Sequence, residues 1–251
     1  MIDTMTDLHT HILPGVDDGA KTPQESIAML QMQYAQGVNT VVMTPHFYPE
    51  RESVDDFLSR RTAASAELEH AISKLSEGER MCLPQWVVGA EVAYAPGFHK
   101  AEDLKRLCIG QTKHMLLEMP FYFWDQRLLH SLYDVLGHSG VTPVLAHMDR
   151  YVSCQSRRML LEVLEMGLPV QVGTETLART FSPAMHLLRQ GRGHLLASDC
   201  HDPVRRSPNL RQAMQIVEKK LGQETVQELE ETALQLAGVE TGIPENEGME
   251  E

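Results

Sequence analysis

Short apolar runs recur along this chain, and each is followed by a stretch with helical periodicity. The runs are rich in β-branched residues and cover 5–12, 39–46, 85–92, 114–121, 141–148, 168–175 and 194–201. The pattern between them predicts helices over 22–37, 53–78, 124–137, 155–167, 183–190, 207–221 and 224–237. Thr22, followed by Pro23 and with Glu25 three residues on, and Ser53, with Asp56 three residues on, are typical helix starts. This alternation predicts an α/β protein with a parallel sheet.

The composition indicates one globular domain. No linker or low-complexity segment divides the 251 residues, so we expect a single domain over 1–240 and a frayed acidic tail over 241–251. No run is long enough to cross a bilayer, and no secretory signal pattern is expected at the N-terminus. The four cysteines are scattered, which favours free thiols in a reducing compartment and predicts a cytoplasmic location. The net charge of −13 disfavours nucleic acid and anionic lipid as partners.

Histidines and carboxylates gather at the ends of the predicted strands. His9 and His11 lie in the first run, and the later runs carry His46, Glu91, Glu118, His147, Asp199 and His201. In a (β/α) barrel the C-terminal ends of the strands meet on one face, so these side chains are expected to meet there. His9 and His11 are two residues apart, so in a strand they point to the same side. A carboxylate in an apolar strand is costly to bury without a cation, and together these positions predict a metal site.

The types of ligand in this set indicate which metals the site could bind and which reaction it could support. Imidazole and carboxylate ligands without thiolate suit Mn²⁺, Fe or Zn²⁺. The set is larger than one ion needs, and a shared carboxylate such as Glu91 is suited to bridge two ions. Closely spaced divalent ions stabilise the attacking and leaving oxygens of a phosphoryl transfer and generate a hydroxide nucleophile. The charge of several ions would exceed that of their carboxylate ligands, so the site would attract phosphate although the chain is acidic.

These segments resemble a known family. The sequence is similar to the polymerase-and-histidinol-phosphatase (PHP) superfamily, and within it to the manganese-dependent protein-tyrosine phosphatases of bacterial capsule and exopolysaccharide clusters. The similarity rests on DLHTHILPGVDDG, TPHFYP, GAEV, LLEMP, AHMDRY and SDCH, and runs from about residue 2 to about residue 235. It implies a PHP fold, which is a distorted (β/α)7 TIM-like barrel with the metal site at the C-terminal ends of the strands.

The resemblance also implies the ligands of up to three Mn²⁺ ions. It assigns His9, His11 and Asp199 to one ion, Glu91 as a bridge to a second ion completed by Glu118 and His147, and His46, His201 and an aspartate of the DDG pair to the third. The spacing from His11 favours Asp18 over Asp17 as that aspartate. Arg150 and Arg206 match two arginines that the family places at the substrate phosphate. The chain departs from the family at Met148, Asp149 and Asp202, and Asp202 adds a negative charge near the expected phosphate site.

The expected reaction is hydrolysis of protein phosphotyrosine by a metal-activated hydroxide. The resemblance implies a membrane-associated tyrosine autokinase as the partner. The small-molecule alternative is a phosphomonoesterase of histidinol-phosphate type, and a phosphodiesterase or nuclease is disfavoured by the acidic surface. The alternative from another class is a catalytically silent regulatory subunit of polysaccharide assembly, which a missing ligand would favour, and none is missing.

A cysteine mechanism is a rival explanation. CHDPVRRS matches the Cys-x5-Arg-Ser pattern of cysteine-dependent tyrosine phosphatases, with Cys200 and Arg206 in the key positions. Such a loop needs successive backbone N–H groups aimed at phosphate and a thiolate of low pKa. Pro203 removes one N–H, no glycine opens the loop, and Asp199 and Asp202 oppose a thiolate and a phosphate. We therefore interpret the match as chance and expect Cys200 to be a small side chain turned away from the site.

Overall fold

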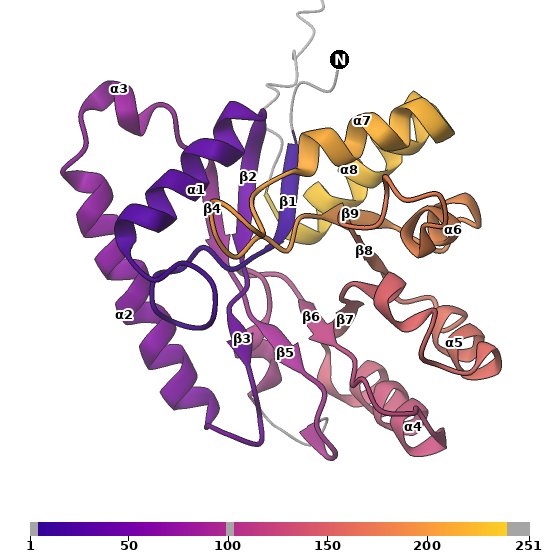
Figure 1. Cartoon of the computed structure of the whole chain (residues 1–251). Helices are drawn as coiled ribbons and strands as arrows, with labels where there is room; N and C mark the ends of the chain where they lie inside the picture. Colours follow the sequence, from indigo (N-terminus) through magenta and orange to yellow (C-terminus); the bar gives the residue numbers. More distant parts are fainter. Residues whose placement is uncertain (1–4, 99–102, 240–251) are drawn as a thin grey trace, which may run out of the picture.

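Short parallel strands form the centre of the molecule, and the helices lie outside them (Figure 1). The computed structural model describes residues 5–98 and 103–239, so the predicted tail at 241–251 lies outside the described residues. The strands are β1 Met5–Thr10, β2 Val38–Met43, β3 His46–Phe47, β4 Gln85–Val88, β5 Glu91–Ala93, β6 His114–Glu118, β7 Thr142–Leu145, β8 Gln171–Gly173 and β9 Leu195–Ala197. Each predicted apolar run contains at least one of them, which confirms the α/β class.

The described strands form three parallel sheets. Their orders are β1-β2-β4, β3-β5-β6-β7 and β8-β9. Single bridges connect the sheets, from Thr10 to Cys200 and from Leu145 to Val170. Continuous hydrogen-bond ladders therefore do not close into a barrel within the described residues. The sheets support the prediction of parallel strands that alternate with helices.

Two of the predicted strands are each divided in two. The run 39–46 becomes β2 and β3, because Pro45 has no N–H to continue a ladder, and the run 85–92 becomes β4 and β5 at Gly89. In the second sheet His46 is paired with Glu91 in register. These two residues thus begin strands, and the prediction that they end strands was wrong. The correction places them side by side.

The seven predicted helices begin within three residues of the predicted starts and end earlier in some cases, and the short helices η2 and η4 were not predicted. They are α1 Pro23–Ala35, α2 Val54–Ser73, α3 Glu77–Arg80, η2 Leu104–Leu107, α4 Gln126–Asp134, η3 Val135–Ser139, η4 Met148–Tyr151, α5 Arg157–Leu164, α6 Pro183–Arg189, α7 Leu210–Leu221 and α8 Gln223–Ala237. Thr22 caps α1 and Ser53 caps α2 through their side chains. The predicted helix over 53–78 was too long, since a capping box at Ser76 starts α3 separately. Within the described residues no helix is long and apolar enough to cross a membrane.

One apolar cluster draws side chains from all three sheets. It contains Leu8 of β1, Leu116 of β6 and Leu195 of β9, all fully buried. Ala233 and Leu236 of α8 pack against the same cluster. The strands therefore share one interior, and α8 covers part of it. A larger apolar cluster fills the space between the strands and the outer helices.

Candidate metal centre

All the predicted ligand side chains meet in one cluster. His9 Nε2 lies 3.1 Å from His11 Nε2, and Glu91 Oε2 lies 3.2 Å from the first and 3.3 Å from the second. Asp199 Oδ1 lies 3.4 Å from His9 Nε2 and 3.3 Å from His11 Nε2. Ligand atoms that share one ion at about 2.1 Å lie about 3.0–3.4 Å apart. These four atoms therefore have the spacing of a metal coordination shell.

Glu91 lies at the centre of the cluster and is fully buried. Its Oε2 faces His9 and His11 and lies 2.9 Å from His46 Nδ1, while its Oε1 lies 2.9 Å from His147 Nε2. Glu118 Oε1 approaches the same His147 nitrogen at 3.5 Å. The two Glu91 oxygens thus face two different sets of donors, as a bridging carboxylate must.

A third group of donors forms around Asp18. Its Oδ1 lies 3.5 Å from His46 Nε2 and 3.4 Å from His201 Nε2. Asp18 is exposed, whereas His201 and the neighbouring His11 are buried. The donor atoms of Asp18, His46, His201 and His11 all lie within 4.8 Å of one another, so this group opens toward solvent at its aspartate.

The other aspartate of the DDG pair points elsewhere. Asp17 Oδ2 accepts a hydrogen bond from His11 Nδ1 at 2.6 Å and from the backbone N–H of His46 at 2.9 Å. Asp17 Oδ1 accepts the N–H of Gly19 at 2.9 Å. Only glycine fits at this last position, because a Cβ there would lie 2.0 Å from the backbone oxygen of His11. The turn thus places Asp17 where it orients His11 by a hydrogen bond, and it directs the side chain of Asp18 toward the cluster.

A buried amide fixes the tautomer of His9. The Gln171 side chain donates through Nε2 to the backbone oxygen of Val172, and its Oε1 accepts the N–H of His147 at 2.7 Å. The same Oε1 lies 3.2 Å from His9 Nδ1, which must therefore be the donor. The lone pair of His9 Nε2 then faces the cluster. Gln171 was not among the predicted site residues, although a polar residue in an apolar strand is a signal that could have identified it.

His11 and His201 are held in the same way. His11 Nδ1 donates to Asp17, and His201 Nδ1 donates to the backbone oxygen of Asp199 at 2.9 Å. Their Nε2 lone pairs, like that of His9, point at one another and at carboxylates. Lone pairs and negative charges repel unless a cation lies between them, and histidine ligands of metals are oriented by such partners.

Unpaired buried atoms support this interpretation. Glu91 Oε2 and His201 Nε2 are buried and make no hydrogen bond within the described residues, and His46 Nδ1 makes none either, although it lies 2.9 Å from Glu91 Oε2. A buried polar atom without a partner costs about 1–3 kcal/mol. Because Glu91 Oε2 and His201 Nε2 both face other candidate ligands, metal coordination accounts for them. The residues present therefore fit divalent ions.

The charges of the cluster are strongly coupled. Burial opposes ionisation of Glu91 and Asp199, yet in the cluster without a metal ion the positive charge of His9 holds the pKa of both carboxyl groups well below their usual values. In return these carboxylates raise the pKa of His9 against the effect of burial, so a proton takes the place that a metal ion would fill. Burial and the charge of Glu91 raise the pKa of Glu118. Burial and the nearby His11 lower the pKa of His201 to about 4. His201 is thus held neutral and able to accept a metal ion.

Two of these side chains stand on strained backbone. His147 has φ 32° and Asp199 has φ 52°, and they are the only residues other than glycine with positive φ in the part of the chain that the structure describes. This conformation costs of order 1–3 kcal/mol and is found mostly at functional sites. The strain sets the direction of both side chains toward the cluster.

Arg150 and Arg206 converge on one oxygen atom at the edge of the cluster. Their Nη2 atoms lie 2.6 Å and 2.7 Å from Asp199 Oδ2. Asp149 and Asp202, which could have paired with them, are engaged elsewhere. Asp149 Oδ1 accepts the N–H of Gly173, and Asp202 accepts the backbone N–H groups of the three residues 204–206. The departures from the family pattern thus have local structural roles.

Cys200 is fully buried, and neither Arg150 nor Arg206 forms a hydrogen bond with its sulfur in the described part of the chain. Its neighbour in the structure is Gln33, whose Nε2 lies 3.7 Å from the sulfur. Burial, with the nearby Asp7, raises the pKa of the thiol well above its usual value. A nucleophilic cysteine needs the opposite shift.

A parallel-stranded α/β fold with a cluster of imidazole and carboxylate donors at the strand ends defines the class of metal-binding hydrolytic proteins. The chain belongs to the CpsB/CapC family of capsular polysaccharide synthesis, whose model matches residues 5–233. It is 28% identical over 243 residues to tyrosine-protein phosphatase CpsB of Streptococcus pneumoniae, covering 90% of this chain and 94% of that protein. It is 29% identical over 237 residues to tyrosine-protein phosphatase YwqE of Bacillus subtilis, covering 91% and 90%.

Solved structures show the same likeness. A crystal structure described as YwqE from Bacillus subtilis and CpsB from Streptococcus pneumoniae, "unique metal-dependent tyrosine phosphatases", superimposes with a TM-score of 0.79. The sequence identity is 27%, and the match covers 94% of this chain and 96% of that one.

Proposed function

We propose that this protein is a metal-dependent protein-tyrosine phosphatase that acts in capsular or exopolysaccharide synthesis. The observation that carries the proposal is the cluster of lone pairs and carboxylates around Glu91, which fits metal ions and lies beside two converging arginines. The family of the chain and the printed activities of its relatives support the same function.

The ligands we propose follow the three donor groups. His9, His11 and Asp199 would hold one ion, Glu91, Glu118 and His147 a second, and Asp18, His46 and His201 a third, with Glu91 shared. The donor set suits Mn²⁺, Fe or Zn²⁺, and we propose Mn²⁺. When bound, such ions supply Lewis acidity and lower the pKa of a water molecule.

The chain's own residues supply orientation. Arg150 and Arg206 would bind the phosphate oxygens, because a guanidinium group donates two parallel hydrogen bonds to an oxyanion. Asp17 and Gln171 hold the imidazoles in the tautomers that accept a metal ion. The leaving phenolate has an ordinary pKa near 10 and departs readily.

The substrate we propose is phosphotyrosine of a protein, and a membrane-associated tyrosine autokinase is the partner that the resemblance favours. We propose that residues 1–240 form one domain and that the strands form a distorted (β/α)7 barrel. The single bridges between the sheets and the shared cluster of Leu8, Leu116 and Leu195 support the barrel. The cysteines, all free, are consistent with the cytoplasmic location that we propose.

The test is metal analysis of the purified protein together with phosphatase assays. We expect two to three bound ions per chain, and hydrolysis of p-nitrophenyl phosphate that is lost on chelation and restored best by Mn²⁺. A phosphotyrosyl peptide should be a better substrate than a phosphoseryl peptide or histidinol phosphate. Preference for histidinol phosphate would favour the small-molecule alternative, and full activity without metal would contradict the proposal.

A further inference from the structure

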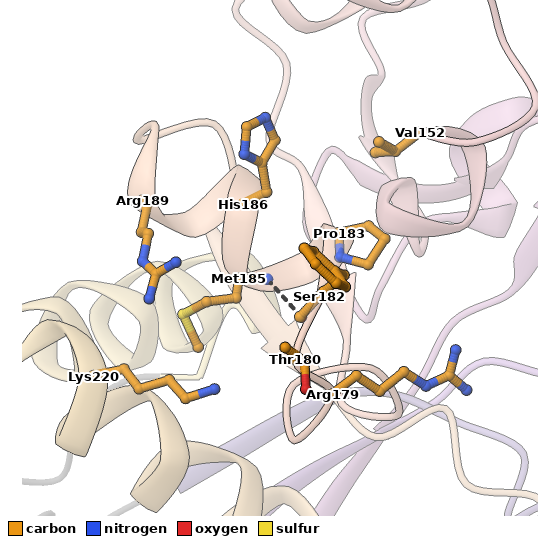
Figure 2. A pocket seen from close by; sticks show the side chains of 10 residues that line it. Val152, Arg179, Thr180, Ser182, Pro183, Met185, His186, Arg189 and Lys220 are labelled. Carbon is orange, nitrogen blue, oxygen red and sulfur yellow. Dashed lines mark hydrogen bonds between the residues drawn. The ribbon is translucent and has the colours of Figure 1, made fainter.

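A cavity of about 410 Å³ lies between α6, α7 and the segment that follows η4. Figure 2 shows its lining, which comes from Val152 just after η4, the loop before α6, α6 itself and α7. Val152, which lines it, is two residues after Arg150. The cavity thus adjoins the segment that carries one of the proposed phosphate-binding residues.

The lining is basic in a chain that is acidic. Arg179, Arg189 and Lys220 line this cavity, and no aspartate or glutamate does. The Lys220 ammonium donates to the backbone oxygen of Leu177 at 3.1 Å. The guanidinium groups of Arg179 and Arg189 are exposed and make no hydrogen bond or ion pair with any other described residue. Their charges are therefore free to bind an anion.

A second cavity of about 410 Å³ adjoins the first and lies between α5 and α6. The two share Val152 and His186 in their linings. The second is lined by Leu160 and Leu164, by Arg157, and by Arg192, whose guanidinium group pairs with Glu165 at 3.4 Å. Together the two cavities form a groove lined by basic and apolar residues, which we call the α5–α6 groove.

An exposed aromatic residue marks the rim. Phe181 is 91% exposed and lines the first cavity. Large apolar side chains exposed beside a groove are typical of binding surfaces, and aromatic ones are frequent anchors of them.

Resting on the phosphatase function proposed above, we propose that the α5–α6 groove docks an extended segment of the protein substrate. The segment carries anionic side chains, either carboxylates or a second phosphate, next to apolar ones. Charge complementarity is the reason for this occupant, since a protein of net charge −13 repels an acidic peptide everywhere except at a basic surface. The groove would thus select which phosphotyrosines reach the metal centre.

The test compares peptides and variants of the whole chain. Three phosphotyrosyl peptides share apolar flanks and carry neutral residues, glutamates, or a second phosphotyrosine beside the target. The variant is Arg179→Glu with Arg189→Glu, and the matched control is Arg127→Glu, an exposed arginine of α4 outside the groove. p-Nitrophenyl phosphate measures the metal centre alone.

We expect the unaltered protein to prefer one or both anionic peptides over the neutral one by roughly three- to tenfold in kcat/KM, mainly through KM. The double variant should lose this preference and keep its rates on the neutral peptide and on p-nitrophenyl phosphate. The control variant should keep both the preference and the rates. The better anionic peptide identifies whether carboxylate or phosphate is preferred.

A double variant that keeps the preference, or an unaltered protein that shows none, would overturn the docking proposal and leave the phosphatase function standing. Hydrolysis of p-nitrophenyl phosphate without hydrolysis of any peptide would contradict the protein-phosphatase function, and the docking proposal with it.

Discussion

Asp17 Oδ2 lies 2.6 Å from His11 Nδ1. Asp17 is not a metal ligand in our assignment, but its carboxylate orients the imidazole of His11, which is one. The hydrogen bond holds the pKa of Asp17 below its usual range against the opposing effect of burial. Asp18, the next residue, faces the third group of donors. The two neighbouring aspartates thus have different roles, and substituting each one separately distinguishes these roles.

Asp17→Asn should weaken metal binding about 10–100-fold, because partners of ligating histidines contribute this much. Asp18→Asn should remove a ligand from one ion only and leave the other ions bound. Metal titration followed by elemental analysis distinguishes the two variants. Unchanged metal affinity in Asp17→Asn would show that the hydrogen bond to His11 is dispensable.

Metal removal should lower stability as well as activity. Ions that bind only the folded chain at a concentration 100-fold above their dissociation constant add about 2.7 kcal/mol. For a chain of this size that corresponds to roughly 5–10 °C in the melting temperature. Calorimetry with Mn²⁺ and with a chelator measures the shift. Equal melting temperatures would mean that the cluster holds no ion under those conditions.

Arg150→Lys and Arg206→Lys should each lower kcat/KM about ten- to a hundredfold, because lysine cannot reproduce a two-pronged contact worth about 1.5–3 kcal/mol. Bound metal should not change. Arg205→Lys is the matched control, since Arg205 is an exposed neighbour of Arg206. Loss of metal from either variant would show that the arginine supports the site through Asp199 instead.

Cys200→Ser should keep most of the phosphatase activity, because the buried thiol has a raised pKa and faces Gln33. Asp199→Ala should abolish activity, since it removes a proposed ligand and the partner of both arginines. The assay is p-nitrophenyl phosphate turnover with metal content measured in parallel. An inactive Cys200→Ser protein with normal metal content would instead favour the cysteine mechanism.

The sequence predicted that the candidate ligands converge, but it did not predict the contacts that orient them. His9 and His11 were expected on one side of a strand, and their Nε2 atoms do lie 3.1 Å apart. The spacing of the DDG pair could only favour Asp18, because which aspartate turns inward depends on the close approach of Gly19 to His11. Gln171 was missed because its role depends on two histidines distant in sequence.

The fold was predicted in class and imperfectly in detail. The division of two predicted strands at Pro45 and Gly89 depends on which partners each half finds, and apolar runs do not carry that information. The sequence also did not predict that both arginines contact Asp199, because Asp149 and Asp202 are closer to them along the chain.

A buried carboxyl group of α8 predicts how stability depends on pH. Burial, with the nearby Asp7, raises the pKa of Glu230 to about 8, and its Oε1 has no partner although Oε2 accepts the N–H of Thr6. The folded chain thus holds a proton that the unfolded chain releases above its ordinary pKa. The contribution of Glu230 to the free energy of unfolding should therefore fall as pH rises from about 4.5 to about 8 and then level off.

Glu230→Gln should remove this slope and stabilise the protein by on the order of 1–3 kcal/mol at pH 7–8. Glu231→Gln, at the exposed next position, should have little effect. Denaturant unfolding at several pH values measures both. Destabilisation by Glu230→Gln at pH 8 would show that the carboxylate is needed in its charged form.

The contact between β1 and the segment that follows β9 has a consequence for biosynthesis. Thr10 at the end of β1 is bridged to Cys200 just after β9, and His9 faces Asp199. A nascent chain on the ribosome therefore has no complete first donor group until the segment around residue 200 has emerged. If the cluster binds metal as we propose, the ions are acquired only after nearly all of the hydrophobic core has been synthesised.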